Sequence, residues 1–252
     1  MASLREQIAE RCVEVDRVKQ MLDLAFAGGA RSSKAPEDRV VFPLLVSCRH
    51  IVEEILFAIN EGFGRSALRS ARTMYECVVT ARHLNLHPEK AEDFLSTFHA
   101  QWAKIIQSIP FEHRGSPMHD RLIEQVPRYA EGKFVGLRDL DWSGKHVLEM
   151  AKESGPLAGL HSVAWDYASA FVHPSAIFVL TTLTRPDPTG SVFEAGARPQ
   201  EQQARLAAQI AHDLVLSAVD LRLKYTASVK LQELFEKCQQ DFLAIWGYPP
   251  HI

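Results

Sequence analysis

The sequence predicts an all-α fold, a single-domain multi-helix bundle. Apolar residues recur at three- and four-residue steps along most of the 252-residue chain, which is the period of a helix that buries one face. Clusters of proline and glycine separate the periodic stretches, as they do between helices. Only a short segment near 177–183 suits a strand. We therefore expect one helical domain over residues 1–252, with its helices packed around a bundle core.

The first half of the chain supplies four predicted helices. Apolar positions have helical spacing over residues 3–27, 36–60, 65–86 and 89–108. Gly28 and Gly29 end the first helix, so that residues 1–36 form an N-terminal helix and loop. The stretch 44–59 is apolar on more than one face, which predicts a central position for the second helix. Pro88 ends the third.

Residues 110–160 are less regular and are expected to cap one end of the bundle. Ser116 and Pro117 suit the N-cap and the first position of a short helix that runs to about 130. Further helices are predicted over 145–153, 157–172, 199–225 and 228–246. The prolines and glycines of 185–199 indicate a loop before the two long C-terminal helices, which span 199–246.

Composition and charge exclude several classes of protein. Lys and Arg number 28 against 31 Asp and Glu, a net charge of −3, so no global basic field is present to coat duplex nucleic acid. No apolar run approaches the ~20 residues of a membrane-spanning helix. The first residues bring charges of both signs without a long apolar core, unlike a secretory signal. The four cysteines form no C-x-x-C pair, and we expect them to be reduced and buried in a cytoplasmic protein.

The predicted helix 65–86 carries charge on an otherwise apolar surface. Four charged residues follow one another at steps of four, three and four and so share one face: Arg65, Arg69, Arg72 and Glu76. Arg72 and Glu76 are close enough to form an i,i+4 ion pair. Two arginines beside a glutamate can hold a phosphate or a carboxylate by forked hydrogen bonds. The alternative is a salt bridge that only positions two helices.

A second polar stripe precedes Pro174. Trp165, Ser169 and His173 are spaced four residues apart. The proline moves His173 out of the helical region, so the histidine is expected at a helix C-terminus, where the dipole favours a protonated imidazole. Ser169 is within its reach. This pattern favours a histidine that acts as acid, base or ligand, and its alternative is a histidine that caps the last helical carbonyls.

A metal centre is a third interpretation of the polar residues. Carboxylates and imidazoles lie on or near the predicted helices at Glu53, Glu54, Glu76, His83, His99, His161 and His173. Di-metal carboxylate bundles use Glu-x-x-His pairs on facing helices. None of the predicted helices carries that spacing. We therefore expect neither a metal nor another cofactor.

Together these segments resemble a bacterial family of helical domains of unknown function. The residues that carry the resemblance are Arg72-x-x-x-Glu76, Trp142-Ser143-Gly144-Lys145 and Ser169-x-x-x-His173-Pro174-Ser175. The resemblance covers about residues 40–185, the family-like core of the chain, and it implies a helical fold. Trp165 stands where the family pattern has tyrosine, so this protein has no hydroxyl there. The Arg, Glu and His pattern is also similar, at the fold level, to small helical ribonucleases used as toxins and in phage defence.

These observations lead to three hypotheses about function. The first is a cytosolic binding or regulatory protein, a defence or toxin-type component, in which Arg69 and Arg72 hold a phosphate-containing ligand. The second is a metal-independent ribonuclease-like enzyme. In that enzyme His173 is the acid or base, with Glu76 and Ser169 as further catalytic candidates, and the two arginines stabilise charge on the phosphate. The third is a di-metal carboxylate bundle protein.

The expected partner is a small anion or RNA, with no membrane. A homodimer is a further prediction, because apolar side chains recur along the last helix. They are Leu231, Leu234, Phe235, Phe242 and Trp246. These side chains suit a dimer interface as well as a core, and core packing is the favoured interpretation.

Overall fold

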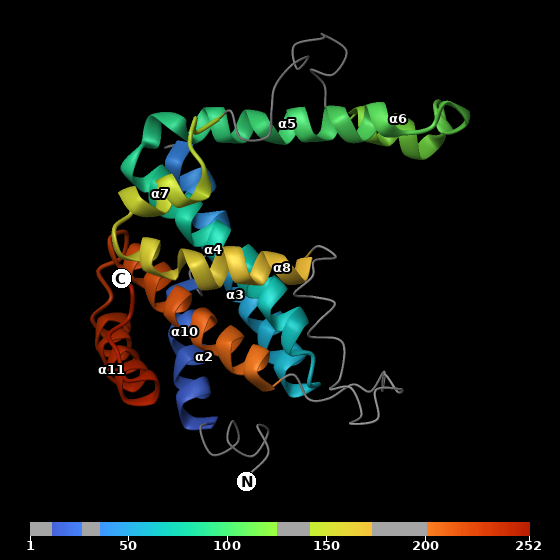
Figure 1. Ribbon diagram of the computed structural model, residues 1–252. Helices are drawn as coiled ribbons and strands as arrows, with labels where there is room; N and C mark the ends of the chain where they lie inside the picture. The colour runs from blue at the N-terminus through green and yellow to red at the C-terminus, as the bar shows by residue number, and fades with distance from the viewer. Residues whose placement is uncertain (1–11, 27–35, 125–141, 173–200) are drawn as a thin grey trace, which may run out of the picture.

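Helices make up all the regular secondary structure of the described residues, which confirms the predicted all-α bundle. The computed structural model describes residues 12–26, 36–124, 142–172 and 201–252 (Figure 1). Within these ranges no helix is long and apolar enough to cross a membrane. The predicted strand near 177–183 and the predicted loop 185–199 lie outside the described residues, as do the start of the first predicted helix and the end of the helix predicted to about 130.

Two helices joined by a tight turn form the centre of the molecule. They are α3 (Pro36–Asn60) and α4 (Gly64–Leu86), which pack against each other along their length. Gly62 lies in the turn with φ of 80°, a left-handed conformation that suits glycine. On α4, Ala67, Ala71 and Val78 are fully buried. Small side chains at helical spacing let neighbouring helices approach α4 closely.

Three further helices complete the bundle. They are α2 (Cys12–Phe26), α10 (Glu201–Leu223) and α11 (Val229–Trp246). Helix α10 packs on both α3 and α4, and α2 packs on α10 and α11. The buried side chains of these helices join those of α3 and α4 in one connected apolar core.

The apolar side chains of α11 take part in this core. Leu231, Phe235 and Phe242 are buried, and Leu234 and Trp246 pack against the core while partly exposed. Their role within the chain is therefore core packing, the favoured interpretation. A homodimer stays a prediction.

The region predicted to cap the bundle divides into two parts. Helix α5 (Ala91–Ser108) follows the 3₁₀ turn η1 (Pro88–Lys90), and it carries η2 (Phe111–His113) and α6 (Pro117–Glu124) at its far end, away from α10 and α11 (Figure 1). Helix α7 (Val147–Glu153) packs directly on α4. Among the described residues of this region, α7 is therefore the helix that covers the centre of the bundle, through α4.

The helix predicted over 157–172 is instead three consecutive segments of different pitch. They are the 3₁₀ segment η4 (Pro156–Leu160), the π-helix η5 (Ser162–Tyr167) and the short α-helix α8 (Ala168–Val172). Gly159 lies where an added Cβ would come within 2.9 Å of the His251 ring, so a larger residue here would displace that ring. Single π turns are rare in proteins, and a large share of those that occur lie at functional sites. This one packs against α4.

Buried polar contacts tie α10 to its neighbours. Arg82 of α4 donates through Nε to Ser217 Oγ at 2.8 Å, and its Nη2 pairs with Asp220 at 2.8 Å. The fully buried Asp213 accepts the backbone N–H of His251 at 2.7 Å, and its second oxygen lies 2.7 Å from the Nδ1 atom of His251. The first contact fixes α10 against α4, and the second fixes the C-terminal residues against α10.

Candidate functional site

Arg72 is the centre of a polar cluster where α4 meets η5 and α8. Its Nε donates a hydrogen bond to Ser169 Oγ at 2.7 Å. Its guanidinium carbon lies 3.8 Å from the ring centroid of Trp165, and its side chain is 20% exposed. The hydrogen bond and the stacking fix the plane of the guanidinium. Arg72 and Ser169, both predicted as site residues, therefore lie together.

Arg69 lies three residues before Arg72 and reaches the end of α8. Its Nε donates to the backbone carbonyl oxygen of Phe171 at 2.5 Å. The last carbonyls of a helix have no partner within that helix, so the arginine caps α8. Arg65 continues the positive stripe along the same face of α4. The predicted stripe of arginines thus faces the predicted serine segment.

Glu76 ends the stripe with a long ion pair. Its Oε1 lies 3.4 Å from Arg72 Nη2, and its side chain is 37% exposed. Burial raises the pKa of the Glu76 carboxyl, and the charge of Arg72 offsets only part of that effect. An exposed i,i+4 pair contributes little to stability. Ser169 and Trp165, rather than Glu76, are therefore the main anchors of Arg72.

Tyr75 and His161 form a buried pair beside this cluster. The Tyr75 hydroxyl donates to the carbonyl oxygen of Leu157 at 3.2 Å and lies 3.2 Å from His161 Nδ1. With the hydroxyl hydrogen directed at Leu157, the Nδ1–H tautomer of His161 can donate to the Tyr75 oxygen. The His161 ring stacks on Trp165 with an interplanar angle of 17°. Burial lowers the pKa of His161, and the charge of Asp166 offsets part of that effect.

His161 was predicted only as a metal candidate, and its position beside Trp165 was not predicted. The spacing held the signal, because His161, Trp165 and Ser169 follow one another at steps of four. Tyr75 gave no signal, since a tyrosine on an apolar helix face is common in a core.

His173 directly follows α8 and lies outside the described residues, as do Pro174 and Ser175. Its role as acid or base therefore stays a prediction. Ser169 and Phe171, which precede it, both accept hydrogen bonds from arginines of α4.

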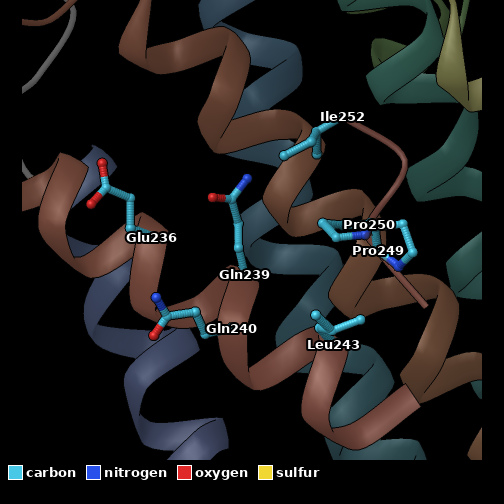
Figure 2. A pocket seen from close by; sticks show the side chains of 7 residues that line it. All are labelled: Glu236, Gln239, Gln240, Leu243, Pro249, Pro250 and Ile252. Atoms are coloured by element: carbon cyan, nitrogen blue, oxygen red, sulfur yellow. The ribbon is translucent and has the colours of Figure 1, made fainter. Parts of the chain in front are cut away.

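A separate groove lies on the surface between α11 and the C-terminal residues. Figure 2 shows the side chains that line it: Glu236, Gln239, Gln240, Leu243, Pro249, Pro250 and Ile252. The polar members of this set are two amides and one carboxylate. They include no cation to hold an anion. The groove is therefore not the candidate site.

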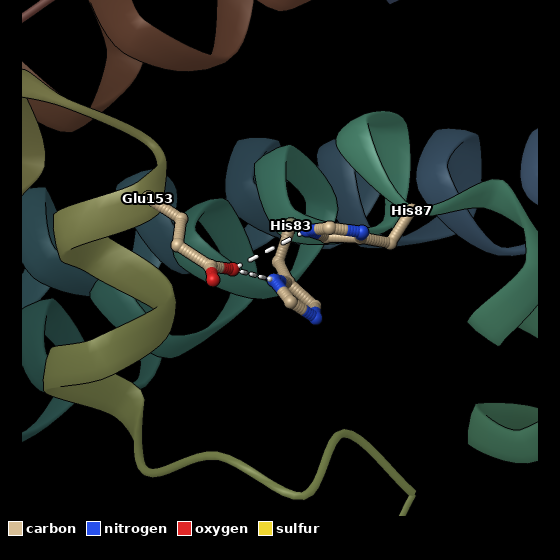
Figure 3. Close-up of side chains that lie close together, drawn as sticks. All are labelled: His83, His87 and Glu153. Carbon is tan, nitrogen blue, oxygen red and sulfur yellow. Dashed lines mark ion pairs between the residues drawn. The ribbon is translucent and has the colours of Figure 1, made fainter.

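Of the predicted metal ligands, only His83 belongs to a group of metal-ligating side chains within the described part of the chain. It lies next to His87 and Glu153, neither of which sequence analysis proposed as a ligand (Figure 3). Glu53 and Glu54 are exposed on α3. The predicted di-metal set thus does not assemble among the described residues.

The comparisons with known proteins agree with the resemblance in the sequence. A family model, described as a family of unknown function (DUF5677), matches residues 38–185. No curated protein and no solved structure matches the chain. The matched range covers more than half of the 252 residues and includes α3, α4 and α8, with Arg72 and Ser169. The chain therefore belongs to DUF5677, a family whose function is unknown.

Proposed function

We propose that the protein binds a small phosphate-containing anion at the Arg69–Arg72–Ser169 face of α4. The observation that carries this proposal is the fixed guanidinium of Arg72, held by Ser169 and by the ring of Trp165. A planar guanidinium that is already in place loses little freedom on binding, and its fork matches two phosphate oxygens.

The charges around Arg72 support an anionic ligand. Three arginines share this face of α4 with one carboxylate, that of Glu76. The Arg72–Glu76 contact is 3.4 Å, longer than a good hydrogen bond, so a phosphate oxygen can replace it.

Calorimetric titration of the full chain with inorganic phosphate, and then with a nucleoside monophosphate, tests this proposal. We expect saturable binding by the wild type. The Arg72→Lys variant should bind at least about tenfold more weakly, because lysine keeps the charge but loses the fork and the flat stacking surface.

Arg39→Ala is the matched control for the loss of an arginine. Arg39 lies on α3 with a side chain that is 58% exposed, so its removal should leave the phosphate affinity unchanged. Circular dichroism establishes that each variant is folded. Equal affinity in the wild type and Arg72→Lys contradicts the proposal, as does the absence of binding by the wild type.

A ribonuclease-like activity is the second candidate, favoured by the half-buried Glu76 carboxyl beside Arg72. A carboxyl with a raised pKa can act as a general acid, and the arginines would stabilise charge on the phosphate. The test is cleavage of single-stranded RNA in the presence of EDTA. We expect His173→Ala and Glu76→Gln to abolish cleavage. Either activity would suit a defence or toxin-type component. A wild type that binds phosphate but leaves RNA intact removes this candidate and retains the first.

A further inference from the structure

Three metal-ligating side chains meet at the C-terminal end of α4. His83 lies in the last turn of this helix, His87 follows it one turn later, and Glu153 is the last residue of α7. Figure 3 shows the carboxylate of Glu153 directed toward both rings. His83 is eleven residues beyond Arg72, which is about 16 Å along a helix. This His–His–Glu cluster is therefore separate from the proposed anion site and rests on different residues.

The distances within the His–His–Glu cluster match the spacing of ligands around one metal ion. Glu153 Oε2 lies 3.1 Å from His83 Nδ1 and 3.3 Å from His87 Nε2. These three ligand atoms all lie within 4.8 Å of one another. A tetrahedral zinc ion, with bonds of about 2.0–2.2 Å, holds its ligand atoms about 3.3 Å apart. Two histidines four residues apart are also a recurrent zinc-binding spacing; here His83 lies in the last turn of α4 and His87 is the C-cap residue.

The buried nitrogen of His83 is the second observation, because it faces a carboxylate without a well-directed hydrogen bond. The His83 side chain is 2% exposed. Among the described residues its Nδ1 atom has no hydrogen-bond partner, although the Glu153 carboxylate is 3.1 Å away. His83 Nδ1 and Glu153 Oε2 are thus close together, but their geometry is not that of a hydrogen bond. Ligand atoms that converge on a common point between them have this relation. A buried polar atom without a partner costs free energy unless something binds it.

The surroundings of the His–His–Glu cluster have the features that support metal ligands. Nδ1 of His87 lies 3.5 Å from Glu89, a carboxylate placed to orient the ring. Lys145 forms an ion pair with Oε1 of Glu153, while Oε2 faces the two histidines. The Trp142 ring packs edge-on against His83, with centroids 5.7 Å apart, and provides an apolar wall. The negative end of the α4 dipole also favours a cation here.

We propose that His83, His87 and Glu153 bind one divalent transition-metal ion, with Zn²⁺ as the ion that suits two imidazoles and one carboxylate. Three protein ligands leave a fourth position on the metal for water or a substrate atom. The ion would join the C-terminal end of α4 to the end of α7. This proposal does not depend on the proposed anion binding.

The test is a titration of the metal-stripped full chain with ZnCl₂, in which calorimetry measures the heat of binding. Titration with CoCl₂ gives a visible spectrum that reports tetrahedral coordination. We expect one equivalent of metal per chain and a rise in Tm. Glu153→Gln and His87→Ala should each weaken binding by at least about tenfold, since even the loss of an outer partner weakens metal sites by that factor.

His87 serves as the second variant because its side chain is 35% exposed, so its removal disturbs the core less than removal of His83. His50→Ala, a change at an exposed histidine of α3, is the matched control and should leave the affinity unchanged. Absence of binding, or an affinity that neither Glu153→Gln nor His87→Ala lowers, overturns the proposal. Phosphate affinity measured on His87→Ala should stay at the wild-type value, which keeps this result distinct from failure of the anion site.

Discussion

The imidazole of His212 is a partly buried base whose two nitrogens have different surroundings. Its Nδ1 accepts a hydrogen bond from Trp246 Nε1 at 3.3 Å. Its Nε2 has no hydrogen-bond partner among the described residues. Burial lowers the pKa of His212 to about 4, below the value of about 6.5 in an unfolded chain. A proton added to Nδ1 would also break the bond from Trp246, which adds to the cost of charging the ring.

This histidine predicts a loss of stability in mild acid. Between pH 6.5 and pH 4 the unfolded chain binds a proton that the folded chain does not, so the free energy of unfolding falls as the pH falls. From pH 7 to pH 5 the wild type should lose about 2 kcal/mol more than His212→Asn. Urea unfolding of both proteins at the two pH values measures this difference. If both proteins lose the same free energy of unfolding, protonation of His212 is not what destabilises the fold in acid.

Replacement of Glu76 separates a structural role from a chemical one. Because the Arg72 pair is long and partly exposed, Glu76→Gln should change the free energy of unfolding by less than about 0.5 kcal/mol. The same change removes a negative charge that competes with the anion, so phosphate should bind more tightly. Urea unfolding and phosphate titration give the two values. An unfolded variant, or weaker phosphate binding, contradicts this view of the site.

At the scale of the elements, the contact of α4 with α10 depends on Arg82. Its side chain is 9% exposed and contacts both Ser217 and Asp220. Arg82→Ala should lower the free energy of unfolding by about 3 kcal/mol, because it leaves Ser217 and Asp220 without their partner. Arg82→Met should cost less, since it restores apolar packing along the stem. A loss below about 0.5 kcal/mol in Arg82→Ala contradicts this role.

Sequence patterns predicted the long helices well and the segment after α7 poorly. The predicted helix 65–86 agrees closely with α4 because its apolar period is sustained over several turns. The segment predicted as one helix over 157–172 changes pitch twice. We attribute these changes to tertiary contacts. Gly159 packs against His251, and the Leu157 carbonyl accepts from Tyr75. No local period reports contacts that join residues so far apart in the chain.

The residues of the candidate sites also fall into two groups, those that follow a local sequence pattern and those that only tertiary packing brings together. The proximity of Arg72 and Ser169 agrees with two polar stripes that repeat at helical spacing in the sequence. The position of Glu153 beside His83 was not predicted, because the two residues meet only after α7 packs on α4. His161 meets Tyr75 across the interface between η5 and α4, again through tertiary packing.

At the scale of the whole molecule, α4 carries both proposed sites and contacts α3, α7, α8 and α10. The two sites are about 16 Å apart along the helix, beyond the range in which substitutions usually couple. The double variant Arg72→Lys/His87→Ala should therefore show the phosphate affinity of Arg72→Lys and the zinc affinity of His87→Ala. Titration of the three variants with each ligand checks this. Any additional loss in the double variant would indicate that α4 couples the sites.

The most direct measurement is a ¹H–¹⁵N spectrum of the indole N–H groups during titration with inorganic phosphate at constant pH. The chain has four tryptophans, and Trp165→Phe assigns the signal from the ring beneath Arg72. An anion bound at Arg72 should move the Trp165 signal until it saturates, while the signals of Trp142 and Trp246 stay in place. In Arg72→Lys the movement should weaken. A Trp165 signal that stays fixed through the titration, or that moves no more than the others, would contradict an anion site at Arg72.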